Sequence, residues 1–258
     1  HAWVKVMAGE TWDDLVAAAV AGGWGGIENL SLIPGSVGAS VVQNIGAYGA
    51  EVETVVDRVE AIDLRSGEQA VFNADECAFG YRTSRFKGHG RDRFIITAVV
   101  LRLDRQPRFI LDYPGVRAAV EALGPVSLVN VRRAIIDIRQ RKLPDPDRIG
   151  NAGSFFKNPV VERPVLETLL GRHPDLPHYP QADGRFKLAA GWLIDRCGWK
   201  GRQWGRAGVH KDQALVLVNR GGATGREILA LSDRIRRSVV DTFDIRLERE
   251  VRVLGTAE

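Results

Sequence analysis

The pattern of apolar and polar positions predicts a chain that mixes strands and helices. Up to position 103 it predicts one helix, which begins after Thr11, ends at Gly22-Gly23 and has Asp14 at the capping-box position. Four further segments alternate as strands do, at 3–6, 55–64, 69–72 and 94–103. The turn residues Ser66-Gly67 join the second and third of these strands into a hairpin.

A second region follows a proline-rich break. The apolar residues of 130–141 recur at helical spacing, and the helix must end before Pro144 and Pro146. Beyond them the pattern predicts short strands at 154–156 and 214–218, helices at 164–170 and 188–196, a long helix through Ile228–Val239, and a final strand at 246–254. We therefore expect an α+β fold in two lobes with a boundary near Pro144.

Composition narrows the class of protein. Of the 258 residues, 45% are hydrophobic and 26% charged, and no run of about 18 apolar residues occurs, which excludes disorder, a coiled coil and a membrane span. The net charge of +4 comes from basic residues interleaved with acidic ones, which favours a solvated surface over a nucleic-acid footprint. Cys77 and Cys197 lack metal-ligand spacing, so we expect no metal site and a reducing compartment. Because the chain starts at His1, we expect that its natural beginning is not represented.

Two segments of the first region could carry chemistry. Leu32–Gly49 is punctuated by glycines, which let a backbone approach a ligand and turn N–H groups toward phosphate oxygens. It is neither a Walker loop nor GxGxxG, and tight turns alone would explain its glycines. In Phe79–Lys87, Tyr81 could stack or hydrogen-bond and Arg82 could stabilise an enolate, although an exposed cationic loop explains the segment equally well.

The second region offers two more candidates. Ser154 lies among small residues that leave its hydroxyl accessible, but a serine at a strand start is commonly structural. Alternation places Glu248 and Glu250 on one face of the last strand, either toward solvent or as a carboxyl pair in a cleft. Scattered cations and tyrosines would suit a nucleotide diphosphate, namely Tyr113, Arg139, Lys142, Lys157, Tyr179, Lys187 and Lys200.

Taken together, these segments resemble one family over essentially the whole chain, that of UDP-N-acetylenolpyruvoylglucosamine reductase, and in particular its longer, tyrosine-loop subtype. The resemblance is carried by NLSLIPGSVGASVVQNIGAYG, FGYRTSRF, RKLPDP, GNAGSFFKNPVV, YPQADG, KLAAGWLID, QALVLVN and LEREVRVLG. It implies an FAD-binding lobe of the vanillyl-alcohol-oxidase kind at 1–143, a smaller substrate lobe at 144–244 and a terminal strand at 245–258 that returns to the first lobe. The family's preceding lobe, with its own FAD loop, has no counterpart in this sequence, so we expect the chain to lack it.

The resemblance also implies an activity. Members use NADPH and FAD to convert UDP-N-acetylglucosamine enolpyruvate to UDP-N-acetylmuramate for peptidoglycan, in the cytoplasm, and thereby serve cell-wall growth and division. Hydride transfer to the vinyl carbon leaves an enolate that needs stabilisation and a proton. The family pattern assigns protonation to Ser154 and stabilisation to Arg82 and Glu250. Glu250 can help only if it is protonated or relays a proton, which implies a raised pKa.

Binding residues follow from the same resemblance. For the flavin and its pyrophosphate it implies Ile33, Pro34, Gly35, Ser36, Gly38, Ala39, Ser40, Gln43, Asn44, Gly46 and Arg82. For the UDP-sugar it implies Tyr81, Tyr113, Lys142, Asn158, Tyr179, Lys187, Lys200 and Gln213, and Tyr113 could also meet the nicotinamide. Arg249 stands where members often have proline.

Three other interpretations remain open: a truncated form that binds UDP-sugar without redox activity, another flavoprotein of the same fold, and, more distantly, a nucleic-acid-binding protein. Under the leading interpretation the partner is a small molecule, with no nucleic acid or membrane involved, and the protein is a monomer.

Overall fold

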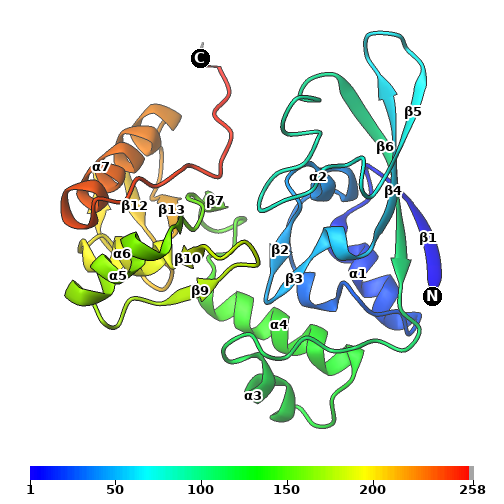
Figure 1. Ribbon diagram of the computed structural model, residues 1–258, viewed down its shortest axis with the longest axis horizontal. Coiled ribbons are helices and arrows are strands. Elements are labelled where there is room, and N and C mark those ends of the chain that lie inside the picture. Colours follow the sequence, from blue (N-terminus) through cyan, green and yellow to red (C-terminus); the bar gives the residue numbers. More distant parts are fainter. Residues whose placement is uncertain (256–258) are drawn as a thin grey trace. The chain divides into compact units, whose positions relative to one another are not determined.

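The computed structural model describes residues 1–255, which form two compact units, 1–139 and 140 onward. The boundary falls within helix α4 (Leu128–Lys142), a few residues before the predicted break at Pro144 (Figure 1). Each unit contains both helices and sheets, so the expected α+β class is confirmed. The assignment of 1–143 and 144–244 to a cofactor lobe and a substrate lobe remains a prediction.

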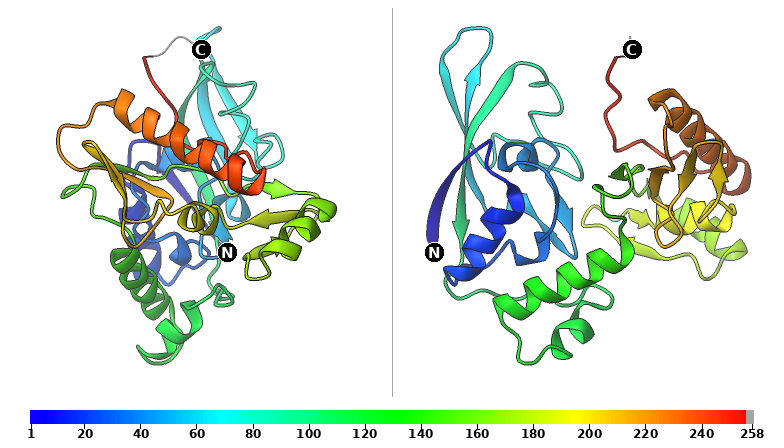
Figure 2. Two further views of the ribbon diagram at one scale, coloured as in Figure 1. Left: turned by 90° about the vertical axis from the view of Figure 1, so that its left-hand side faces the viewer. Right: turned by 180° about the vertical axis from the view of Figure 1, so that it is seen from behind.

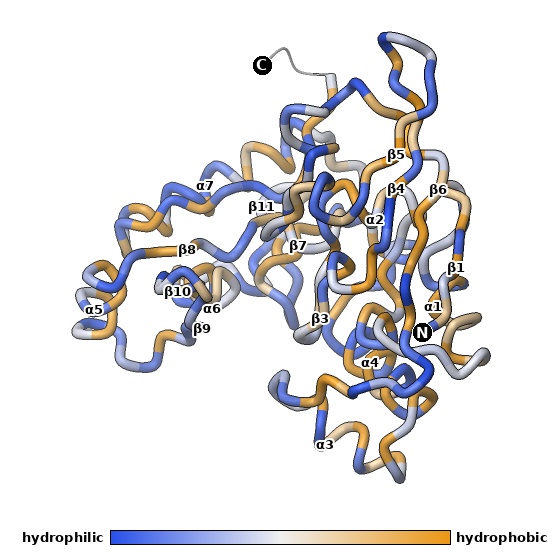
Figure 3. The backbone as a smooth tube through the Cα atoms, turned by 45° about the vertical axis from the view of Figure 1, so that its right-hand side comes forward, coloured by the Kyte–Doolittle hydropathy of each residue, from blue (hydrophilic) through white to orange (hydrophobic). Residues whose placement is uncertain are grey.

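The first unit is built on a four-stranded antiparallel sheet. Its strand order is β1 (Ala2–Met7), β6 (Phe94–Leu103), β4 (Val56–Asp63) and β5 (Gln69–Asn73), and the last two form the predicted hairpin. Figure 3 shows hydrophobic residues along β6, the strand that lies between β1 and β4. Because a central strand is covered more fully than an edge strand, Ala98 to Leu101 of β6 are all buried.

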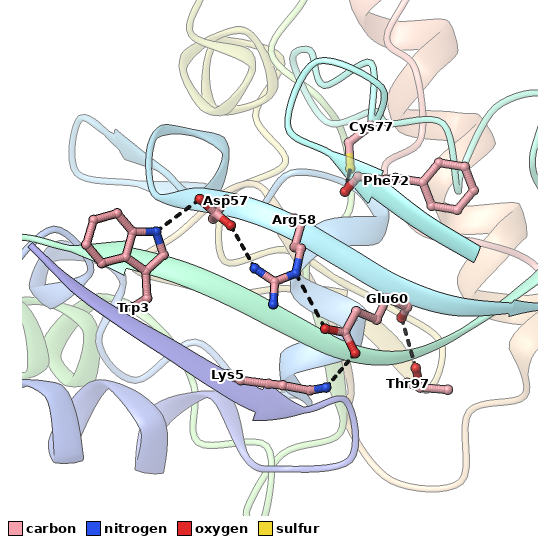
Figure 4. A network of polar contacts seen from close by, with 8 residues as sticks. All are labelled: Trp3, Lys5, Asp57, Arg58, Glu60, Phe72, Cys77 and Thr97. Carbon is pink, nitrogen blue, oxygen red and sulfur yellow. Dashed lines mark hydrogen bonds and ion pairs between the residues drawn. The ribbon is translucent and has the colours of Figure 1, made fainter. Parts of the chain in front are cut away.

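Helices cover one face of this sheet (Figure 2). They are α1 (Trp12–Ala21) and α2 (Val37–Val42), and Val16, Val37 and Val41 pack with Val99 and Leu101 of β6 in one core. The opposite face carries a chain of polar contacts: Trp3 donates to Asp57 at 3.1 Å and Lys5 pairs with Glu60 at 2.6 Å (Figure 4). The unit also contains β2 (Gly46–Ala47), β3 (Ala50–Glu51), α3 (Val116–Glu121) and two short 3₁₀ helices, η1 (Glu28–Leu30) and η2 (Val52–Thr54).

Up to residue 255, the second unit contains two small sheets and three helices of its own around an apolar core. One sheet has the order β11 (Gln203–Trp204), β12 (Ala207–Val209), β13 (Val216–Asn219) and β7 (Asn151–Ser154). The other has the order β8 (Val160–Val161), β10 (Phe186–Leu188) and β9 (His178–Pro180). The helices are α5 (Arg163–Arg172), α6 (Ala190–Arg196) and α7 (Gly225–Phe243). The predicted apolar stripe of α7 is confirmed, since Leu231, Ile235 and Val239 are buried.

Two sequence predictions about element ends were wrong. Thr11 begins α1 but its side chain makes no capping hydrogen bond, whereas Thr224 and Glu227 form a full capping box at the start of α7. The strand predicted at 246–254 is not formed as a regular strand among the described residues; a single bridge joins Arg249 to Phe156. The return of 245–258 to the first lobe remains a prediction.

None of the helices within residues 1–255 has the length and apolar character needed to cross a lipid bilayer.

Candidate active site

The glycine-rich segment of the first unit presents an open backbone. Ser36 caps α2 by accepting a hydrogen bond from Ala39 N at 3.4 Å, and Gly35 precedes it at φ +110°, with nothing within 4 Å of the place where a Cβ would be. Among the described residues, neither the Gly35 nor the Ser36 amide donates a hydrogen bond. By contrast, a Cβ on Gly38 would lie 2.6 Å from Ala8 Cβ, so that glycine is needed for packing. Two successive amides that donate no hydrogen bond, one of them on an exposed glycine, fit an anionic group such as the pyrophosphate of FAD.

The predicted cofactor residues divide into two groups by exposure. Pro34, Gly35 and Ala39 are exposed, and Ile33, Ser36, Gln43 and Gly46 are half-buried, so these can meet a ligand. Gly38, Ser40 and Asn44 are buried, and the side chains of the latter two bond within the protein: Ser40 donates to Val37 O at 2.6 Å. We infer that these three shape the segment.

Asn44 joins this segment to the loop that carries Tyr81 and Arg82. Its side chain is fully buried; it donates to Glu51 Oε2 at 3.0 Å and to Gly80 O at 3.2 Å, and it accepts from Glu53 N at 3.1 Å. All the polar atoms of one amide are therefore used to fix the two loops together. Sequence reasoning had predicted only flavin contact for this residue.

Arg82 is held by the same segment. Its guanidinium donates to Gly46 O at 2.6 Å and Asn44 O at 3.4 Å, and it lies 4.0 Å from Glu51. A Cβ on Gly46 would lie only 2.9 Å from Arg82 Nη1. Glycine at position 46 therefore lets the guanidinium of Arg82 come this close to the backbone. The guanidinium is thus fixed by the very residues predicted to bind the flavin.

Backbone strain gathers in this region. Within the described residues, seven non-glycine residues have left-handed φ, and four of them belong to these loops: Leu32 (φ 58°), Asn44 (φ 49°), Tyr48 (φ 50°) and Arg82 (φ 55°). Such conformations cost about 1–3 kcal/mol each and are concentrated at functional sites. The clustering supports the choice of these loops as the candidate site.

Two further contacts of the first unit were not foreseen from the sequence. Asp13 accepts from both Arg132 Nη1 (2.7 Å) and Nη2 (2.9 Å), and from Leu32 N (2.5 Å), so it fixes the start of the glycine-rich segment. Burial would raise the pKa of Asp13, but the hydrogen bonds from Arg132 and Leu32 outweigh burial and lower it. The only available signal was the acidic first turn of α1, which is common in helices.

Tyr48 lies beside the predicted ligand contact Tyr113. The two rings meet edge to face at 5.3 Å, and Tyr48 interacts electrostatically with the side chain of Arg139 on α4. Burial raises the pKa of Tyr48 and lowers that of Arg139, so both groups sit in a site of restricted solvation. The sequence placed Arg139 only among scattered cations. In the structure it interacts with Tyr48, so we include it in the candidate site.

In the second unit the structure brings Ser154 and Glu250 onto adjoining segments. Ser154 ends β7 after Gly153, which has φ +68°, and its side chain is half-buried. Glu250 N donates to Phe155 O at 2.9 Å, one residue from Ser154. The two predicted catalytic groups thus come from neighbouring backbone, while Arg82 belongs to the first unit. Glu248 pairs with Lys157 at 2.5 Å.

Most of the predicted sugar-binding residues also lie in the second unit. Tyr179 and Lys187 are cross-strand partners in β9 and β10, and Asn158 Oδ1 accepts from Ala190 N at the start of α6. Lys200, which follows α6 and is exposed, pairs with Asp195 of that helix at 3.2 Å. Gln213 lies beside α6, with its Oε1 3.3 Å from the place of a Cβ on Gly191. Tyr81 and Tyr113 belong to the first unit, and Lys142 is exposed at the end of α4.

Within residues 1–255 no group of three or more His, Cys, Asp or Glu side chains is arranged to hold a metal ion.

Comparison with family models matches two stretches of the chain. Residues 145–254 match the model of the "UDP-N-acetylenolpyruvoylglucosamine reductase, C-terminal domain", and residues 1–73 match that of an FAD binding domain. The UDP-N-acetylenolpyruvoylglucosamine reductase of Cupriavidus pinatubonensis is 52% identical over 98% of this chain and 76% of its own length. That of Chromobacterium violaceum is also 52% identical, over 97% of this chain and 74% of its own length.

A solved structure agrees with these matches. The crystal structure of UDP-N-acetylenolpyruvylglucosamine reductase (MurB) from Thermus caldophilus superposes with a TM-score of 0.68 at 26% identity, covering 98% of this chain and 73% of that one. The FAD-binding model confirms the cofactor predicted from the sequence, and the open amides at Gly35 and Ser36 suit its phosphates. The chain therefore belongs to the UDP-N-acetylenolpyruvoylglucosamine reductase family and is an FAD-dependent oxidoreductase.

Proposed function

We propose that this protein uses NADPH to reduce UDP-N-acetylglucosamine enolpyruvate to UDP-N-acetylmuramate in peptidoglycan synthesis, as a cytoplasmic monomer. The relatives' shared name supports the substrate. The observation that carries the mechanism is that Ser154 and Glu250 lie on adjoining segments, which are joined by the bond from Glu250 N to Phe155 O.

The reaction requires a stabilised carbanion and a proton. The residues of the Ile33–Gly46 segment would hold FAD, which when bound would supply a hydride that originates from NADPH. Addition of that hydride to the terminal vinyl carbon places negative charge on the carbon beside the substrate carboxylate. The task of this chain is to stabilise the enolate and to protonate that carbon.

Arg82 is the proposed electrostatic stabiliser. Its side chain is only 17% exposed and its guanidinium is held by the carbonyls of Asn44 and Gly46, so it needs little reorganisation when charge develops. A fixed donor of this kind typically lowers a barrier by about 3–4 kcal/mol. Arg82 keeps a left-handed backbone although this conformation costs free energy, as is typical of a residue whose side-chain orientation is needed for function.

Ser154 is the proposed proton donor. A hydroxyl is a weak acid, but an enolate carbon is strongly basic, which makes the transfer favourable. Ser154 is half-buried, and Glu250 on the adjoining segment would assist by donating or relaying a proton. General acid catalysis of this kind contributes about 10²–10⁴-fold.

The diphosphate and sugar would be bound mainly by cations and hydrogen-bonding side chains of the second unit. Lys187 and Tyr179 offer an ammonium and a phenol from facing strands, and Asn158 offers an amide next to α6. Lys142, Lys200, Gln213, Tyr81 and Tyr113 complete the proposed set, and Tyr113 would meet the nicotinamide when NADPH occupies the site.

The Ser154→Ala variant tests this mechanism in two separate half-reactions. Flavin absorbance in a stopped-flow instrument reports reduction by NADPH and then reoxidation by the enolpyruvyl sugar. We expect reduction to be unchanged and reoxidation to slow by about 10²–10⁴-fold, while Ser66→Ala, a change in an exposed turn, alters neither. Equal slowing of both half-reactions would show that Ser154 is not the donor. A wild-type protein that binds the UDP-sugar but consumes no NADPH would instead be the binding form without redox activity.

A further inference from the structure

Arg249 connects the segment before Glu250 to helix α7. Its Nε donates to Ser232 Oγ at 2.9 Å and its Nη2 donates to Asp233 Oδ1 at 2.6 Å. Ser232 is fully buried and donates its own hydroxyl to Leu229 O at 2.8 Å, so its oxygen is turned to accept from Arg249. The Arg249 side chain is only 25% exposed, which makes this a fixed, charge-assisted contact.

A second arginine holds the same segment by its main chain. Arg236 Nε donates to Leu247 O at 3.0 Å, and Arg236 Nη1 lies 3.3 Å from Asp233 Oδ1. The carboxylate of Asp233 therefore serves two arginines, one on α7 and one on the segment. We call Ser232, Asp233, Arg236 and Arg249 the α7 latch.

The backbone next to the latch pairs with the segment that follows Ser154. Lys157 N donates to Glu248 O and Glu250 N donates to Phe155 O, both at 2.9 Å, on either side of the bridge between Arg249 and Phe156. Beyond this one bridge the segment pairs with no strand within residues 1–255. Because so short a ladder is weak by itself, side-chain contacts must fix its position.

We propose that Arg249 is a positioning residue of the reaction, which acts through the α7 latch to hold Glu250 beside the Ser154 segment. This inference rests on the proposed function, since it concerns the same pair of groups. Arg249 itself touches neither substrate nor cofactor in this proposal. Its effect is to keep the Glu250 backbone in register with Phe155, and hence the Glu250 carboxyl near the carbon that Ser154 protonates.

The proposal predicts an effect on one half-reaction only. A displacement of about 1 Å in a positioned group can slow a reaction by about 100-fold. We therefore expect Arg249→Ala to slow flavin reoxidation by the enolpyruvyl sugar by about 10–100-fold at saturating substrate. The half-saturating substrate concentration and the rate of flavin reduction by NADPH should stay the same, because neither depends on the Glu250 carboxyl.

Three variants make the test specific. Arg249→Lys keeps the charge opposite Asp233 but cannot also reach Ser232 with a second fixed donor, so it should recover part of the lost rate. Asp233→Asn weakens the latch from the helix side and should slow the same half-reaction. Arg246→Ala removes a positive charge from an exposed position of the same segment and should leave both half-reactions unchanged.

The outcomes separate this inference from the proposed function. Wild-type turnover of NADPH with the enolpyruvyl sugar establishes the function; its absence refutes that function, and the inference with it. Given wild-type turnover, wild-type rates in Arg249→Ala overturn the inference. So does equal slowing of both half-reactions together with a lowered melting temperature, because it would mean that the latch only stabilises the fold. Selective slowing with partial rescue by lysine supports it.

Discussion

Replacement of Gly46 by alanine tests whether the glycine-rich segment holds Arg82 in place. The added Cβ would lie 2.8 Å from Glu51 Cγ, 2.9 Å from Arg82 Nη1 and 3.1 Å from Ala50 O. Gly46 does not have a left-handed φ, so alanine meets no backbone penalty and acts only through this crowding. The side chains of Arg82 and Glu51 must move, since the Ala50 carbonyl belongs to the fixed backbone.

The cost can be worked out from these contacts. Overpacking of a filled site typically costs about 1–3 kcal/mol, and a hydrogen bond to a charged group contributes about 1.5–3 kcal/mol. If the guanidinium gives up its 2.6 Å bond to Gly46 O, we expect the free energy of unfolding to fall by about 2 kcal/mol. Loss of a positioned enolate stabiliser should slow flavin reoxidation by the enolpyruvyl sugar by about 10²–10³-fold.

Urea unfolding followed by tryptophan fluorescence gives the first quantity, and stopped-flow flavin absorbance gives the second. Gly9→Ala is the matched control, because nothing lies within 4 Å of the place of its Cβ and its φ is not left-handed. A Gly46→Ala protein with the stability and reoxidation rate of Gly9→Ala would refute the idea that this close approach positions Arg82.

Three further outcomes follow from described contacts. The pKa of Asp13 is lowered in the folded state from its usual 3.8, so its carboxylate stabilises the fold above that pH. Near pH 7 we expect Asp13→Asn to be less stable than the wild type by about 1–3 kcal/mol. In urea titrations this difference should shrink as the pH falls below 4. Thr224→Ala removes the capping box of α7 and should cost about 1 kcal/mol by the same assay, whereas an unchanged midpoint would contradict a capping role. Burial raises the pKa of Cys77 to about 12, so a disulfide reagent at pH 8 should modify this thiol only after unfolding, and rapid labelling of the native protein would contradict its burial.

The parts of the fold with a local signal were predictable from sequence. The β4–β5 hairpin follows from alternation around Ser66-Gly67, and α7 follows from apolar spacings of three and four residues. Helix α2 was not expected, because glycine and β-branched valine have low helix propensity. The helix is stabilised by the Ser36 cap and by the packing of Gly38 on Ala8, and no local sequence pattern contains these contacts.

The candidate site was predictable in its motifs but not in its internal contacts. The segments around Arg82 and Ser154 could be named from the sequence, yet the bond from Asn44 to Gly80 spans 36 residues and that from Arg132 to Asp13 spans 119. Alternation over 246–254 predicted a strand, but there the Arg249 side chain turns to α7 and pairing stops at one bridge. Such long-range pairing depends on the folded arrangement, so a single sequence carries no sign of it.

The left-handed backbone of Arg82 has a consequence for attempts to make this protein more heat-resistant. A residue held at φ 55° remains there only while its surroundings oppose relaxation, and here the opposition comes from the Gly46 and Asn44 carbonyls. Replacement of Arg82 by glycine, which adopts this φ without strain, would relieve that cost but would remove the guanidinium and its two bonds. Any gain in stability from relieving the strain at this position is therefore expected to come with a loss of turnover.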